Sequence, residues 1–197
     1  HHAEPARAGE DTRTYQRLVA DVADPELDAC VSVKPTQLGL DVGEDAFRRN
    51  LDRVVATAAD HGAFVWIDME DHTTTDATLD AYEHHAREHG DVGVCLQANL
   101  RRTADDLERL AGLPGTVRLV KGAYDPPADV AYRGRDRVDE AYRSALRLAF
   151  ERFDDGVAVG SHDPAMIDLA ADLHDEHGTG YEIQMLMGVR EEAQRRL

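Results

Sequence analysis

The sequence predicts an α/β protein of the (β/α)8 TIM-like barrel type, because strand-like and helix-like segments alternate along the chain. Six nearly continuous apolar runs, typical of buried parallel strands, are each followed by a segment of helical periodicity. No glycine-rich dinucleotide turn follows any run, which disfavours an open doubly wound sheet. A polar side chain ends or follows each run: Lys34, Asp68, Gln97, Lys121, His162 and Gln184. Barrel active sites are built from such strand ends, so we expect a functional site there.

The six strands are expected at residues 29–34, 63–68, 92–97, 116–121, 157–161 and 181–186. Helical periodicity predicts helices at residues 11–29, which includes the helix exit, and at 47–58, 75–89, 138–153 and 164–177, with a last helix starting near Val189. A further helix is expected to begin at Thr103, because Thr103 to Asp106 has the pattern of a capping box. A complete barrel has eight strands, so six strand–helix pairs predict an incomplete one.

The helix boundaries have recognisable signals. Three expected helices end in an acidic residue, a histidine and a glycine, at residues 60–62, 88–90 and 176–178. Glycine suits the left-handed position after a helix, and histidine suits the negative end of the helix dipole. We therefore assign structural roles to His61, His89 and His177. Asp163 followed by Pro164 predicts an N-cap and a first helical residue.

Composition limits the possible partners. With 197 residues, 42% of them hydrophobic, the chain can bury one sizeable core, and we expect one domain over residues 1–197. The net charge of −17 would repel phosphate backbones, so nucleic acid is excluded as a partner. Only two of the 22 basic residues are lysines, and 39 residues are acidic. This balance predicts a salt-adapted, halophilic protein.

The cysteines and the hydropathy pattern indicate the compartment. Cys30 and Cys95 lie in or beside apolar strand runs, which predicts buried thiols in a reducing compartment rather than a disulfide framework. No apolar run approaches the ~18 residues of a membrane-spanning helix, and no signal peptide is visible. We expect a cytoplasmic protein.

Four charged residues, three at strand ends and one inside a strand, are the first candidates for chemistry. Lys34 and Lys121, the two lysines of the chain, both end apolar strands. Lys121 could form a Schiff base, as in a lyase of the barrel type, or anchor a phosphate or carboxylate. Asp68 leaves the core directly after a buried strand, which favours a functional role. Arg118 alternates with apolar neighbours inside a strand, and a buried arginine needs an anionic partner such as a bound anion or Asp68.

Other sequence patterns are weaker evidence for a catalytic or binding role. Gln97 can donate and accept hydrogen bonds at once, which suits the edge of a heteroaromatic ring. Ser161, His162 and Asp163 have the residue types of a catalytic triad, but three consecutive residues cannot form the relay geometry. The run from His85 to His89 matches a zinc-protease pattern, but it lies in the last turn of a helix without an evident third ligand. We predict no metal site.

Six motifs, taken in order, resemble the successive strand ends of proline dehydrogenases. They are Val31-Ser32-Val33-Lys34-Pro35-Thr36-Gln37, Ile67-Asp68-Met69-Glu70-Asp71, Leu96-Gln97-Ala98, Arg118-Leu119-Val120-Lys121-Gly122-Ala123-Tyr124, Ser161-His162-Asp163 and Glu182-Ile183-Gln184-Met185-Leu186. The resemblance covers the chain from about residue 29 to its end. It implies a distorted (β/α)8 barrel that holds FAD, oxidises L-proline to Δ1-pyrroline-5-carboxylate and passes electrons to a quinone at the inner face of the membrane.

The resemblance also implies roles for individual residues. Asp68 matches the active-site aspartate, and Arg118 matches the arginine beside the reactive flavin nitrogen. Lys34 matches the lysine that contacts the proline carboxylate, and Tyr124 matches an aromatic residue near the substrate. The positions that match flavin contacts are Met69, Gln97, Lys121, Gly122, Ala123, Ser161 and His162. These roles agree with the chemistry, since FAD carries a pyrophosphate and a reduced flavin gains negative charge that a fixed arginine stabilises.

The sequence departs from the family pattern at two places. Pro35 replaces the usual leucine, and it favours an extended backbone at Lys34. The family continues into an eighth strand and a helix with a paired arginine that clamps the proline carboxylate, and Arg195-Arg196 is not that pair. The six strands match the second to seventh strands of the family, so we expect a partial barrel domain whose activity and oligomeric state the sequence leaves open. A non-catalytic barrel fragment is the third hypothesis, beside the dehydrogenase and the lyase.

Overall fold

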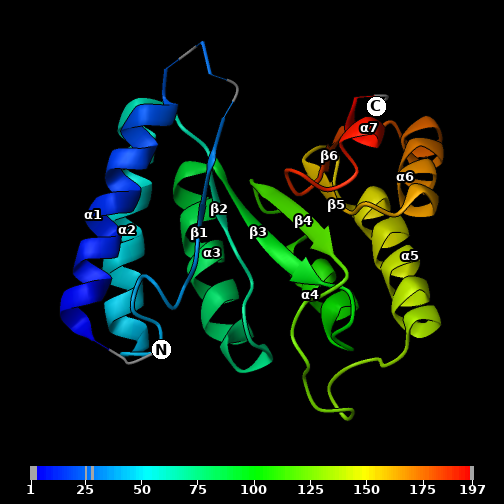
Figure 1. The fold of residues 1–197 in the computed structure, drawn as a ribbon, viewed down its shortest axis with the longest axis horizontal. Coiled ribbons are helices and arrows are strands. Elements are labelled where there is room, and N and C mark those ends of the chain that lie inside the picture. Colours follow the sequence, from blue (N-terminus) through cyan, green and yellow to red (C-terminus); the bar gives the residue numbers. More distant parts are fainter. Residues whose placement is uncertain (1–3, 25, 28, 196–197) are drawn as a thin grey trace. The chain divides into compact units, whose positions relative to one another are not determined.

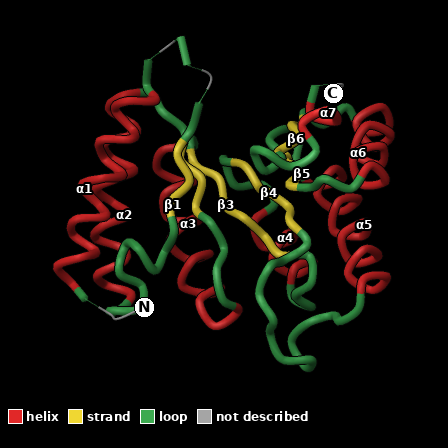
Figure 2. The backbone as a smooth tube through the Cα atoms, in the orientation of Figure 1, coloured by secondary structure: helices red, strands yellow, loops and turns green. Residues whose placement is uncertain are grey.

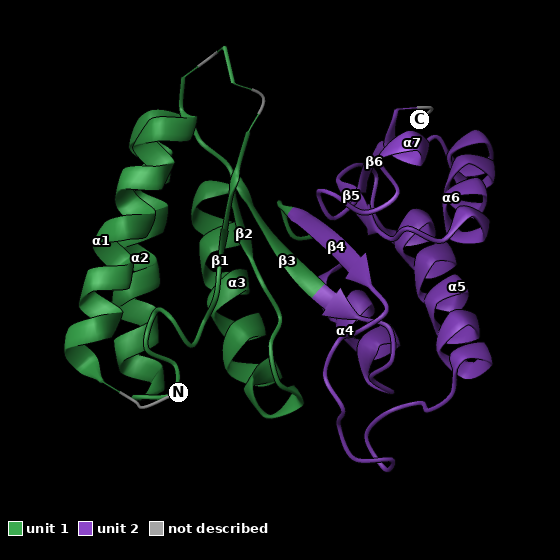
Figure 3. Cartoon of the chain, viewed as in Figure 1, with its two compact units in different colours: residues 1–95, 113–115 green, residues 96–112, 116–197 purple. Residues whose placement is uncertain are grey.

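Two compact units make up the computed structural model, which describes residues 4–24, 26–27 and 29–195 (Figure 3). Unit 1 contains the residues up to Cys95 together with Leu113–Gly115, and unit 2 contains Leu96–Gly112 and the residues from Thr116 onward. In each unit, strands alternate with helices, as Figures 1 and 2 show. The expectation of a single domain stays a prediction. Arg196 and Leu197, and residues 25 and 28 of the first expected helix exit, lie outside the described residues.

Unit 1 is built on parallel strands. Its elements are α1 (Pro5–Val22), β1 (Val31–Val33), α2 (Glu44–His61), β2 (Val65–Ile67), the short 3-10 helix η1 (His72–Thr74), α3 (Thr75–His89) and the first residues of β3 (Val92–Gln97). β2 pairs in parallel with both β1 and β3, with Val33 beside Ile67 and Ile67 beside Val94. The largest fully buried side chains of α2 and α3 are Phe47, Leu51, Leu79 and Tyr82. These apolar faces exclude water from the sheet and supply the main stabilisation of the unit.

Unit 2 repeats this construction. It contains the end of β3, then α4 (Thr103–Leu110), β4 (Thr116–Val120), α5 (Arg135–Arg152), β5 (Val157–Gly160), α6 (Pro164–His177), β6 (Tyr181–Gln184) and α7 (Glu191–Gln194). β5 pairs in parallel with β4 and β6, so that Val120, Gly160 and Gln184 lie in one row. The amide of Ala98, just past β3, donates to the carbonyl of Val120 over 2.8 Å. The predicted α/β alternation of parallel strands and helices is confirmed.

Most predicted boundaries agree with the structure, but the two ends of the chain differ. The first helix begins at Pro5, six residues before the expected start, because proline fits the first helical position and alanine-rich sequence follows. The sixth strand ends at Gln184 rather than at residue 186, and the last helix comprises only Glu191–Gln194. The expected glycine at a helix end is confirmed at Gly62 and Gly178, which both have left-handed backbone angles.

Two local predictions are wrong. Thr103 does not cap α4, because it is the first helical residue and its hydroxyl donates to the carbonyl of Gln97 over 2.5 Å. Asp106 accepts two hydrogen bonds from the Arg102 guanidinium instead of closing a capping box. Cys95 is a buried thiol as expected, but Cys30 is exposed because it precedes β1 instead of lying inside it. Within the described residues, no helix combines the length and apolar composition that a membrane span requires.

Candidate active site

In unit 1, an ion pair joins the ends of two neighbouring strands. Lys34 follows β1 and Asp68 follows β2, and the parallel register places Val33 directly beside Ile67. The Lys34 Nζ lies 3.0 Å from the Asp68 Oδ2, with the lysine side chain 49% exposed and the aspartate 21% exposed. Met69, the next residue, is buried. The sequence prediction that Lys34 and Asp68 share one strand edge is confirmed.

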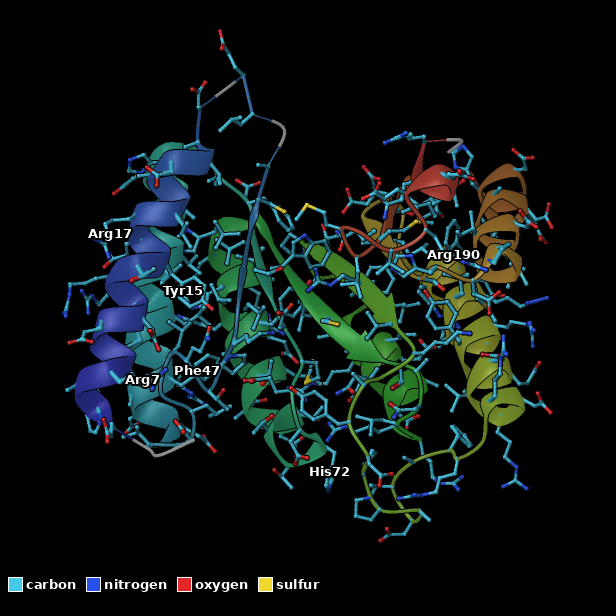
Figure 4. The ribbon with its side chains drawn as sticks, viewed as in Figure 1. Arg7, Tyr15, Arg17, Phe47, His72 and Arg190 are labelled. Carbon is cyan, nitrogen blue, oxygen red and sulfur yellow. The ribbon has the colours of Figure 1, made fainter. Side chains whose placement is uncertain are left out.

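Two side chains that the sequence interpretation missed hold the loop after Lys34. The hydroxyl of Tyr15, on α1, accepts a hydrogen bond from the Lys34 amide over 3.3 Å and donates to the side chain of Gln37 (α1 and Tyr15 in Figure 4). Burial raises the pKa of Tyr15 despite the nearby Lys34, so the phenol keeps its proton to donate. Glu70 is buried, and its carboxylate accepts from the amide of Thr36 over 2.7 Å and from its hydroxyl over 2.8 Å. A buried acid is the signal that could have singled out Glu70.

In unit 2, Arg118 of β4 reaches a side chain of β6. The burial of β4 alternates, and Arg118 is half-buried rather than buried as predicted. Its Nη1 donates to the Gln184 Oε1 over 3.0 Å. Gly160 of β5 lies between these strands, and a Cβ there would come within 3.6 Å of the Arg118 Cγ and 2.7 Å of the Val120 side chain. The missing side chain of Gly160 therefore leaves the room that the Val120 side chain occupies.

Two carboxylates clamp Lys121 at the end of β4. The Lys121 Nζ donates to the Asp163 Oδ2 over 2.8 Å and to the Asp139 Oδ1. Burial alone would lower the pKa of Lys121, but the hydrogen bonds to both aspartates outweigh it and raise the pKa. Lys121 in turn lowers the pKa of Asp163, which also caps α6 by accepting from the Ala165 amide, as predicted. Because a Schiff-base lysine must lose its proton to attack a carbonyl, this clamp disfavours the lyase hypothesis.

The turn after β4 is closely packed against the end of β3. Gly122 has a φ of +108°, and a Cβ there would lie 2.5 Å from the Cγ of Asn99. Asn99 is 7% exposed, and its Oδ1 has no hydrogen-bond partner among the described residues. Gln97 is also buried. Ala123 and Tyr124, next along the turn, are exposed. The missing side chain of Gly122 therefore leaves the room that the Asn99 side chain occupies, and the buried Oδ1 of Asn99 is an acceptor without a partner among the described residues.

The end of β5 carries a buried hydrogen-bond donor, whereas Asn99 carries a buried acceptor. Ser161 is buried, and its hydroxyl accepts from the Asp163 amide over 3.1 Å. The Nε2 of His162 accepts from the Leu186 amide over 2.9 Å, which places the proton of a neutral imidazole on Nδ1. That Nδ1 is buried and has no partner within the described residues. The buried acceptor of Asn99 and the buried donor of His162, both without a partner among the described residues, fit a ligand that both donates and accepts hydrogen bonds.

The fold and these strand-end residues define a protein of the (β/α)8 barrel class. The chain belongs to the proline dehydrogenase family, whose family model matches residues 3–197. Proline dehydrogenase 2 of Bacillus subtilis (strain 168) is 38% identical over 197 residues, which cover 98% of this chain and 63% of that protein. Proline dehydrogenase of Deinococcus radiodurans is 36% identical over 203 residues, which cover 98% of this chain and 64% of that protein.

Solved structures share the fold. Proline utilization A (PutA) from Bdellovibrio bacteriovorus, inactivated by N-propargylglycine, superposes with a TM-score of 0.82 at 23% identity. The match covers 96% of this chain and 25% of PutA. A Bradyrhizobium japonicum PutA variant gives a TM-score of 0.80 at 16% identity, over 98% of this chain and 24% of that one. The chain spans less than two thirds of the curated relatives that it matches.

Proposed function

We propose that the protein oxidises L-proline to Δ1-pyrroline-5-carboxylate in proline catabolism, with FAD as the hydride acceptor and a quinone as the final electron acceptor. Membership of the proline dehydrogenase family supports this function. The observation that carries it is the ion pair of Lys34 and Asp68, 3.0 Å apart at the ends of neighbouring strands. FAD, when bound, supplies the hydride chemistry, and the protein supplies position and field.

The unit 1 residues would bind the substrate. Proline is a zwitterion, so its carboxylate needs a cation and its amine is stabilised by a nearby negative charge. Lys34 would donate to the carboxylate, because its ammonium is half exposed at the end of β1. Asp68 would hold that ammonium in place and provide the negative charge for the amine. Tyr15 and Glu70 would act as positioning residues, since they fix the backbone on either side of Lys34.

The unit 2 residues would hold the cofactor. Arg118, fixed by Gln184, would stabilise the negative charge that a reduced flavin gains. Lys121, held between Asp139 and Asp163, would contact the cofactor through the remaining donor capacity of its ammonium. Gly122 is proposed as a flavin contact on the family resemblance, and the Nδ1–H of His162 would donate to the cofactor. Met69, Gln97, Ala123 and Ser161 are proposed as further flavin contacts, and Tyr124 as a substrate contact, on the family resemblance alone.

The cellular setting is part of the same proposal. A quinone acceptor dissolved in a membrane would require peripheral contact of a cytoplasmic protein with the inner face of that membrane. The −17 net charge supports salt adaptation, since screening at high salt relieves the repulsion among surface carboxylates. Membrane contact is tested by cosedimentation with quinone-containing vesicles. Salt adaptation is tested by measuring the free energy of unfolding from low to molar salt. A salt-adapted chain gains stability across that range.

The function is tested by proline-dependent reduction of an artificial electron acceptor. The protein, expressed from the full reading frame that encodes residues 1–197, is loaded with FAD and assayed with L-proline. Lys34→Met should raise KM roughly 10- to 100-fold, because a hydrogen bond to a charged group contributes about 1.5–3 kcal/mol. Arg17→Met, which removes an exposed cation of α1, is the matched control and should leave KM unchanged (Figure 4). FAD-loaded protein that turns over no proline would support the non-catalytic hypothesis instead.

A further inference from the structure

A cluster of two histidines and an aspartate lies on the helices of unit 1, apart from the residues discussed above. His84 and His85 come from α3, and Asp52 comes from α2. One potential ligand atom from each of the three residues lies within 4.8 Å of the others. The His85 Nε2 is 3.2 Å from the Asp52 Oδ1. Tetrahedral zinc with bonds of about 2.0–2.1 Å separates neighbouring ligand atoms by roughly 3.3 Å, close to this spacing.

His85 has the features of a ligand held ready by the protein. Its side chain is 4% exposed, and its Nε2 faces Asp52. Its Nδ1 has no hydrogen-bond partner in the described part of the chain.

The other two residues leave the cluster open to solvent. The side chains of His84 and Asp52 are 57% and 53% exposed, so His84 can rotate to close the ligand set and water can complete it. Glu88 lies 3.5 Å from the His84 Nε2 and adds negative charge on the same helix. The −17 charge of the chain attracts cations over a longer range.

We propose that Asp52, His84 and His85 form a binding site for a divalent transition metal, with Zn²⁺ the preferred ion. Two imidazoles and one carboxylate are a donor set that suits zinc, and the open position takes water. The ligands come from two helices, so the bound ion stabilises the packing of α2 on α3. This site differs from the sequence pattern at His85 to His89, because its carboxylate comes from Asp52, 32 positions before His84, and not from Glu88.

Co²⁺ is the spectroscopic probe, and Zn²⁺ competes for it. Purified protein is titrated with Co²⁺, and the visible absorption of the bound ion gives the affinity and the geometry. We expect no thiolate-to-metal charge-transfer band, which excludes binding by the exposed Cys30. Asp52→Asn and His85→Ala should each weaken binding at least about tenfold, since even outer-shell changes cost 10- to 100-fold. Zn²⁺ should raise the melting temperature of the wild type and not of these variants.

Two histidine variants serve as controls. His177→Ala removes an exposed histidine of unit 2, and His89→Ala breaks the zinc-protease pattern, and neither should change the affinity by more than about twofold. Asp52→Asn changes an exposed residue without changing its volume, so it keeps the test valid if His85→Ala does not fold. Equal affinity of the wild type and Asp52→Asn, or a loss of binding in His89→Ala alone, would overturn the proposal and leave His85 as a core histidine bonded to Asp52.

Discussion

Replacing Gly122 by alanine tests how closely the turn after β4 packs on Asn99. A Cβ at this glycine would lie 2.5 Å from the Asn99 Cγ and 2.7 Å from its Nδ2, and the φ is +108°. The backbone strain of a non-glycine residue in such a region costs about 1–3 kcal/mol, and overpacking adds about 1–3 kcal/mol. We therefore expect Gly122→Ala to lower the free energy of unfolding by about 2–6 kcal/mol.

A control separates these two contributions. Gly178 also has a positive φ, +77°, but a Cβ there meets nothing within 4 Å. Gly178→Ala should therefore cost only the strain, about 1–2 kcal/mol. Adding Asn99→Ala to Gly122→Ala should recover most of the difference and give a coupling energy of about 1–3 kcal/mol.

Urea unfolding followed by far-UV circular dichroism measures these three variants and the Asn99→Ala single variant that the coupling energy requires. Circular dichroism is used because it follows the helices of both units, whereas Trp66, the one tryptophan of the sequence, belongs to unit 1. Equal costs at Gly122 and Gly178, or no coupling to Asn99, would refute the assignment of a steric contact to this turn.

Three further changes test other contacts. Gly93→Ala should cost about 1–3 kcal/mol, because its Cβ would lie 2.5 Å from the Trp66 ring, and a shift in tryptophan fluorescence should accompany the loss. Asp163→Asn should lower the free energy of unfolding at neutral pH, because Lys121 depresses the folded pKa of Asp163 and so stabilises the folded protein while Asp163 is charged. The difference from the wild type should shrink as pH falls below about 4, where protonation of Asp163 removes this stabilisation. Urea titrations at pH 7 and pH 3 would show a constant difference if the ion pair of Lys121 and Asp163 contributes nothing. Tyr142→Phe removes a buried hydrogen bond of 3.0 Å to the Leu119 carbonyl and should cost about 0.5–1.5 kcal/mol in the same assay, whereas a neutral or stabilising result would contradict that assignment.

Patterns local in sequence predicted the strands, most helix boundaries and the strand-end residues. Continuous apolar runs identified the strands, since burial on both faces leaves no room for polar residues. The N-cap at Asp163 and the helix end at Gly178 depend on backbone geometry within a few residues, and both were predicted correctly. The capping box at Thr103 failed because its hydroxyl instead bonds the carbonyl of Gln97, six residues earlier.

The partners of the site residues could not be predicted, because they depend on how helices lie over strands. Asp139 of α5 bonds Lys121, which lies eighteen residues earlier in the chain. Asp139 shares the buried face of α5 with Tyr142, and an acidic residue on a buried face is the pattern that could have indicated a charged partner. Asp52 meets His85 only because α2 packs beside α3. Side-chain partners at such separations follow from the register of packed elements, which a single sequence does not specify.

We propose that this chain carries cofactor and substrate residues of a proline dehydrogenase. The most direct test is the anaerobic mixing of FAD-loaded protein with L-proline while the absorption of oxidised flavin is recorded. We expect L-proline to bleach the flavin absorption and Δ1-pyrroline-5-carboxylate to form in an amount equal to the flavin reduced. Flavin that binds and stays oxidised in the presence of saturating L-proline would contradict it.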